Sequence, residues 1–221
     1  MLRMLAVGLV GLLAALPATA GNFTDDTNRF KLSAPDGWVT EPSPDPIVAI
    51  ILASPRKADT RGNCNVAVSA NQMVGKTQAE VDNELSGMVN EQFWRVLLGQ
   101  VKFFKKTTID KTGDKDQGGR KVFFVQSTSD VEVPGSAFTV TQLVNLHVLP
   151  GQTFFVTCSA LAASFATESP DFDTILASFE PRPDMTVAAT RWSINREYLR
   201  EATARSGAEA AAAGAKRAAR R

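Results

Sequence analysis

Apolar and polar residues follow two different periods along this chain. Alternation with a period of two, or a short β-branched run, predicts strands. These strands cover residues 23–32, 47–52, 64–68, 101–109, 120–129, 137–149 and 152–161. The connections 133–136 and 150–151 are short and contain proline and glycine, which predicts antiparallel neighbours. Residues 110–119 are expected to form a solvated loop, because their Asp and Gly residues lack the spacing of a calcium site.

The period changes to three and four residues after Lys76. Thr77 and Glu80 have the spacing of a capping box, which marks the start of a helix. Apolar residues then form one stripe from Val81 to Leu97, and Gly99 is a stop signal. This pattern predicts one long helix in the middle of the chain, lying on the sheet.

A second helix is predicted near the end of the patterned region. Ser169 has the chemistry of an N-cap, Pro170 suits the first helical position, and Asp171 suits the positive end of the helix dipole. The apolar stripe of this helix consists of Phe172, Ile175, Leu176 and Phe179. The order of elements predicts an α+β fold with a central antiparallel sheet of about seven strands, one long helix mid-chain and one C-terminal helix.

The first twenty residues have the pattern of a signal peptide. Arg3 precedes an apolar run from Leu5 to Leu16, and Ala18 and Ala20 have the small side chains that a signal peptidase accepts. The run is shorter than the ~20 residues that a membrane-spanning helix needs, which disfavours an uncleaved anchor. We expect cleavage between Ala20 and Gly21 and a periplasmic or secreted protein. No cysteine stands at this site to take a lipid.

Charge divides the remaining chain into a domain at 21–183 and a basic tail at 184–221. Residues 191–221 hold eight basic and three acidic side chains, whereas residues 1–190 hold sixteen and twenty. The body therefore lacks the basic excess of a nucleic-acid-binding protein. We expect the Ala-rich tail to be flexible, with a short amphipathic helix between Arg191 and Arg205 as one alternative, and weak contact with an anionic membrane surface as another.

Short motifs at the two ends of the domain carry a resemblance to a known family. Phe30-Lys31-Leu32 ahead of Pro35-x-Gly37-Trp38, and Ile175-Leu176-Ala177-Ser178-Phe179, together with the element order, resemble the PsbP-like superfamily. Its members include the photosystem II protein PsbP, a small Ran-binding protein, and exported bacterial DcrB-like and LpqN-like proteins. The resemblance implies an α-β-α sandwich over residues 23–180 and a binding, assembly or accessory role. It brings no catalytic residues to this chain.

Two cysteines, Cys64 and Cys158, stand in a chain that is expected to enter an oxidising compartment. They either form one disulfide or remain two small buried apolar side chains. A bridge requires Cα atoms within about 7 Å and would contribute ~4 kcal/mol in the chain-entropy model.

Residues with catalytic chemistry are few. The single histidine, His147, lies on the more polar side of its strand, where it is either a hydrogen-bonded structural residue or a surface or groove residue. Trp38 either packs in the core or lines a ligand groove. Neither a metal-ligand spacing, a phosphate-binding glycine loop nor a serine-nucleophile motif appears, so the sequence predicts no cofactor.

Three functions are compatible with these patterns. The first is an exported, non-catalytic binding or envelope-accessory protein whose partner is an envelope protein or a small ligand. The second is a periplasmic carrier of a small molecule or lipid, with an apolar pocket between sheet and helix. The third is a hydrolase, which requires His147 beside a nucleophile and a carboxylate.

Overall fold

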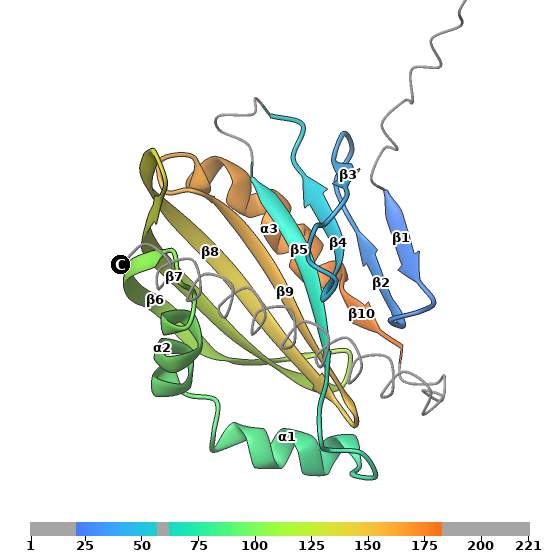
Figure 1. Ribbon diagram of the computed structural model, residues 1–221. Helices are drawn as coiled ribbons and strands as arrows, with labels where there is room; N and C mark the ends of the chain where they lie inside the picture. The colour runs from blue at the N-terminus through green and yellow to red at the C-terminus, as the bar shows by residue number, and fades with distance from the viewer. Residues whose placement is uncertain (1–20, 57–61, 183–221) are drawn as a thin grey trace, which may run out of the picture.

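The computed structural model describes residues 21–56 and 62–182 (Figure 1). The predicted signal peptide and the predicted tail, residues 1–20 and 184–221, lie outside the described residues. Within them the chain forms an α+β fold, as predicted, with a large antiparallel sheet of seven strands and three helices.

The large sheet is antiparallel throughout its described pairs and has the order β3-β4-β5-β9-β8-β7-β6. Its strands are β3 (Val39–Glu41), β4 (Val48–Ala53), β5 (Asn63–Ala70), β9 (Gln152–Leu161), β8 (Ser136–Leu149), β7 (Arg120–Val133) and β6 (Phe104–Gln117). A small second sheet joins β1 (Asn22–Asp25), β2 (Phe30–Ser33) and β10 (Glu180–Pro181).

The predicted strand at 23–32 is a hairpin of β1 and β2 in the small sheet. Asp25 ends β1, because its Oδ1 accepts hydrogen bonds from the backbone amides of Thr27 at 2.8 Å and Asn28 at 2.7 Å. A carboxylate that satisfies local amides in this way favours a turn over a continuing strand. The seventh place in the large sheet is taken instead by β3.

The loop predicted at 110–119 was also wrong, since these residues extend β6. The pairing with β7 continues to Gln117 and Arg120. The turn between them consists of Gly118 and Gly119, whose φ angles are 60° and 75°. Glycine adopts this left-handed conformation without strain, so two residues suffice to reverse the chain.

The predicted long helix is two helices, α1 (Gln78–Ser86) and α2 (Glu91–Gly99). The capping box of Thr77 and Glu80 begins α1 as predicted, but Gly87 caps its end. Asn90 then caps a new helix. A glycine followed by an asparagine N-cap breaks the helix although the apolar period runs on.

The last helix, α3 (Phe165–Ser178), begins one turn earlier than predicted. Ser164 takes the cap position and Pro170 lies inside the helix, so Ser169 is not its N-cap. Phe165 packs against the core and its ring lies 5.9 Å from that of Phe172. We attribute the earlier start to the burial of this turn, which outweighs the backbone hydrogen bond that Pro170 cannot donate.

A hydrophobic core lies on each face of the large sheet, because alternate residues of a strand point to opposite sides. The core beneath α3 and the small sheet contains Phe30, Phe154 and the two cysteines. The other core lies beneath α1 and α2 and contains Trp94, Phe123 and Leu146. In Figure 1, α3 lies behind the sheet, α2 lies at the left and α1 lies along the bottom.

Candidate functional site

Cys64 and Cys158 form a disulfide. They are directly paired across β5 and β9, with Cα atoms 4.0 Å apart. Both are buried in the core beneath α3. The bridge joins parts of the chain that are 94 residues apart in the sequence, so it stabilises the centre of the sheet.

Trp38 lies in the core, which is one of the two roles that the sequence left open, and it does not line a ligand groove. The indole is fully buried, and its Nε1 donates a hydrogen bond to Oδ2 of Asp171 at 3.2 Å. Its ring meets that of Phe172 edge to face. Asp171 therefore lies well inside α3 and satisfies a buried indole, whereas the sequence suggested a role at the helix start.

His147 is also a core residue, which rules out the surface or groove position that the sequence left as one alternative. It is 3% exposed, its ring lies 4.6 Å from that of Phe179, and its Nε2 has no hydrogen-bond partner among the described residues. Burial lowers the pKa of His147 to about 3, helped by the positive charges of Lys115 and Arg120. The imidazole is neutral at pH 7, and its burial leaves it out of reach of a substrate.

An ion pair between a partly exposed arginine and a buried glutamate ties the segment after β4 to α3. The carboxylate of Glu168 is fully buried and lies 2.7 Å from Nε of Arg56. The hydroxyl of Ser54 donates to the same oxygen, Oε1, at 3.2 Å. Arg56 is partly exposed and also donates to the carbonyl of Thr167. These contacts give Glu168 and Arg56 a structural role, because they join the segment after β4 to α3.

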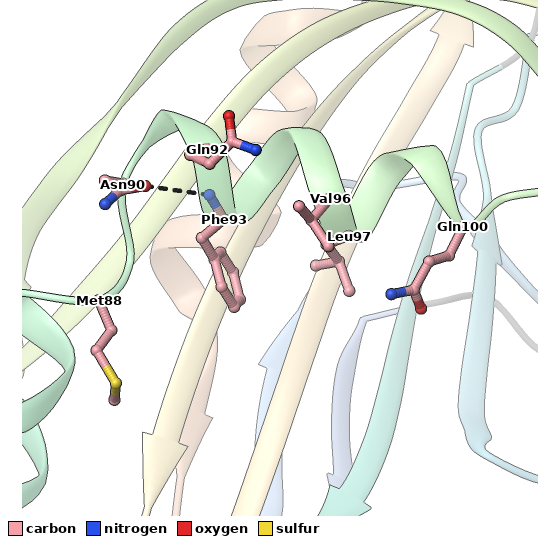
Figure 2. Close-up of a pocket in the computed structure, with 7 residues that line it drawn as sticks. All are labelled: Met88, Asn90, Gln92, Phe93, Val96, Leu97 and Gln100. Atoms are coloured by element: carbon pink, nitrogen blue, oxygen red, sulfur yellow. Dashed lines mark hydrogen bonds between the residues drawn. The ribbon is translucent and has the colours of Figure 1, made fainter.

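The described surface contains an apolar hollow along α2, with a volume of about 380 Å³ (Figure 2). We call it the α2 hollow. It is lined by Met88, Asn90, Gln92, Phe93, Val96, Leu97 and Gln100. Figure 2 shows that the side chains of Phe93 and Leu97 extend from the same side of α2, and that Met88, on the segment before the helix, points in the same direction. Met88 and Val96 are about half exposed, at 49% and 55%.

The local sequence explains why apolar side chains remain at the surface here. Trp94 and Leu98, four residues apart, are buried and anchor α2 to the sheet. Phe93 and Leu97 follow the same spacing one position earlier and are only half buried against that core. The apolar arc of α2 is therefore wider than the sheet can cover, and its excess lines the hollow.

The lining of the α2 hollow carries no ionisable side chain. Its polar groups are the amides of Asn90, Gln92 and Gln100. Glu91 and Arg95 form an exposed ion pair on the same helix, outside the lining. Apolar walls with neutral amides suit an apolar side chain or an acyl chain, and the amides can exchange hydrogen bonds with a backbone or an ester. The lining offers no group for acid–base catalysis.

Sequence reasoning had assigned Phe93, Val96 and Leu97 to the core stripe of one long helix. The signal that could have located the hollow is Asn90, three residues before Phe93, which has the chemistry of a second N-cap. A new helix starting there presents its apolar residues in a different direction from α1.

Among residues 21–56 and 62–182, no three His, Cys, Asp or Glu side chains are placed to hold a metal ion. None of the helices there has the length and apolar character that crossing a membrane requires.

Comparison with solved structures places the fold among PsbP-like proteins. The solution structure of the cyanobacterial PsbP protein CyanoP from Synechocystis matches with a TM-score of 0.51 and 15% identity over 79% of this chain and 98% of that chain. LpqN of Mycobacterium tuberculosis, described as involved in cell envelope biogenesis, matches with a TM-score of 0.49 and 15% identity over 73% and 90%. No family model and no curated protein matches the chain. The match to CyanoP confirms the predicted PsbP-like fold.

Proposed function

We propose that this chain is an exported, non-catalytic binding protein of the envelope-accessory kind, and that the α2 hollow receives an apolar segment of its partner. The observation that carries the proposal is the half-exposed pair Met88 and Val96 beside Phe93 and neutral amides. Apolar surface gathered in a hollow typically marks an interaction site. The PsbP-like fold, with helices on both faces of the sheet as in an α-β-α sandwich, supports an accessory role by analogy.

The location that we propose is the periplasm or the extracellular space. The signal-peptide pattern of residues 1–20 supports export, and the disulfide between Cys64 and Cys158 suits an oxidising compartment. Basic residues from Lys216 to Arg221 would add weak attraction to anionic membrane surfaces. Deleting residues 190–221 should then reduce sedimentation with anionic vesicles, and unchanged sedimentation would remove this contribution.

The test compares two Val→Asp variants of the full chain. Val96 lies in the hollow and is 55% exposed, whereas Val74 is 71% exposed and outside it. Affinity capture from an envelope extract should enrich one protein with the wild type and with Val74→Asp, and lose it with Val96→Asp. Capture that Val96→Asp leaves unchanged, or no enriched protein at all, would count against the proposal.

The second candidate is a carrier of a lipid or apolar small molecule. The volume of the α2 hollow, about 380 Å³, falls in the range of small-ligand pockets. Under this alternative, protein purified from its own host should contain stoichiometric lipid, detectable by extraction and mass spectrometry. Val96→Asp should lose that lipid and Val74→Asp should keep it.

A further inference from the structure

One face of the large sheet is free of charge over four neighbouring strands. This face carries the core beneath α1 and α2, and we call its part over β4, β5 and β9 the central face. The register aligns Ile51, Asn65 and Thr157 across it, and Ala67 with Phe155 beside them. Every residue that β4, β5, β9 and β8 place on this side is apolar or an uncharged polar residue.

Such a composition is unusual for a face left to solvent. Antiparallel sheets normally turn polar and charged side chains to water. The edge strand β6 of the same sheet follows that rule, since seven of its fourteen residues are charged. Ile51, Asn65, Ala67, Phe155 and Thr157 are instead half buried. The central face has the composition of a covered surface.

The helices on this side of the sheet do not cover the central face. Among the described elements, α1 packs on β7 and β8, and α2 packs on β6. Neither helix makes a comparable set of contacts with β4, β5 or β9, and α3 packs on β9 from the opposite side. A further segment is needed to cover these strands.

The point where the described chain ends brings such a segment within reach. Arg120 at the start of β7 donates to the carbonyl of Pro181 at 3.1 Å, and the amide of Arg182 donates to the carbonyl of Arg29 at 2.8 Å. Residue 182 therefore lies at the end of the sheet that carries the Gly118–Gly119 turn. The chain that follows starts on the side of α3 and the small sheet, so residues 183–190 have to pass around this end of the large sheet to reach the central face.

The lengths agree with a helix along the central face. Residues 183–190 can extend over about 26 Å at ~3.3 Å per residue. Residues 191–205 would form a helix of about 22 Å. The ten residues of β9 extend over about 33 Å, so the helix would fit within the length of the face.

The chemistry of residues 191–205 matches this surface. At 3.6 residues per turn, Ile194, Tyr198, Leu199 and Trp192 fall within one arc of about 160°. Arg200 and Glu197 lie opposite this arc, and Arg196 lies beside it, one turn from Trp192. An isolated helix of this length is marginal in water and needs a surface to pack on. We propose that residues 191–205 dock as an amphipathic helix along the central face, with the aromatic and aliphatic side chains against the sheet.

Hydrogen–deuterium exchange of the full chain tests this proposal. The amides of residues 191–205 should exchange at least about tenfold more slowly than those of an unstructured chain. Thr157→Glu places a charge in the central face and should abolish that protection. The matched control is Thr40→Glu on β3, an exposed residue aligned with Leu52 on the opposite side, and it should keep the protection.

A second variant guards against a folding defect in Thr157→Glu. Leu199→Glu lies outside the described domain and should also remove the protection of residues 191–205, while β7 and β8 stay protected. Unprotected exchange of residues 191–205 in the wild type would overturn the proposal, and so would protection that survives both variants. Protection that grows with protein concentration would show docking onto a second copy and would equally overturn it. None of these readouts depends on the α2 hollow, so the proposed function is tested separately.

Discussion

The side chain of Asn90 holds the backbone of Phe93, since its Oδ1 accepts a hydrogen bond from the Phe93 amide at 3.1 Å (Figure 2). This bond starts α2 after the break at Gly87, and it fixes the direction in which the lining of the α2 hollow points. A single polar side chain thereby sets the orientation of an apolar site.

Replacing Asn90 by alanine should lower the free energy of unfolding by about 1 kcal/mol, because the first turn of α2 loses its cap. Asn90→Asp is the matched control, since a carboxylate caps equally well, and it should stay close to the wild type. Urea denaturation followed by circular dichroism measures both variants. Equal losses in the two would show that the cap bond is not the cause.

Acid should destabilise the protein through His147. The unfolded imidazole takes up its proton near pH 6.5, whereas burial lowers the folded pKa to about 3. Between these values the unfolded state binds more protons, so stability falls as the pH drops from about 6.5 towards 3. The contribution of His147 amounts to about 2 kcal/mol lost by pH 5.

The measurement is the free energy of unfolding between pH 7 and pH 4 for the wild type and His147→Leu. Carboxylates contribute equally to both curves, so the difference between the curves isolates the imidazole. The variant should show the shallower slope. Parallel curves would contradict the buried neutral state, as would an NMR titration of this single histidine with a midpoint near pH 6.5 in the folded protein.

Reduction of the Cys64–Cys158 disulfide should cost ~4 kcal/mol of stability, because the closed loop of the unfolded chain is long. Guanidinium denaturation with and without a reductant measures this difference. The double variant Cys64→Ala with Cys158→Ala should be insensitive to the reductant, which makes it the control. Coincident curves for the oxidised and reduced wild type would contradict the prediction.

The ion pair between Arg56 and Glu168 should show a coupling free energy of about 1 kcal/mol in a double-mutant cycle of Arg56→Met and Glu168→Gln. We expect the low end of the range for contacting residues, because the Arg56 side chain is 39% exposed and solvent screens its charge. Glu168→Gln alone keeps the hydrogen bond with Ser54 available. Additive losses in the double variant would show that the two charges act independently.

The sequence predicted local elements better than it predicted their limits. The strands around Cys64 and His147 were predicted because apolar and polar residues alternate there. The extension of β6 was missed because an edge strand can carry Lys and Asp at most positions and still pair on its inner side. The pairing of β5 with β9 joins segments far apart in the chain, which no local pattern specifies.

The candidate site could not be predicted from the sequence for a related reason. Phe93 and Trp94 are adjacent and equally apolar, yet Trp94 is buried and Phe93 is half exposed. That difference depends on the direction of α2 after the break between Gly87 and Asn90. His147 was expected on a polar face, but Phe179, the residue that follows α3, packs against it on that side of β8.

The charged edge strand β6 limits how another protein can bind to this one. Its fourteen residues form one edge of the large sheet, and β3 at the other edge has only three. Lysines and aspartates along an exposed edge discourage a foreign strand from pairing there. Both edges of the sheet therefore disfavour a partner that binds by adding a β-strand. A partner has to bind through contacts with side chains instead. A peptide library screened against this protein should accordingly return apolar helical peptides in preference to extended strands.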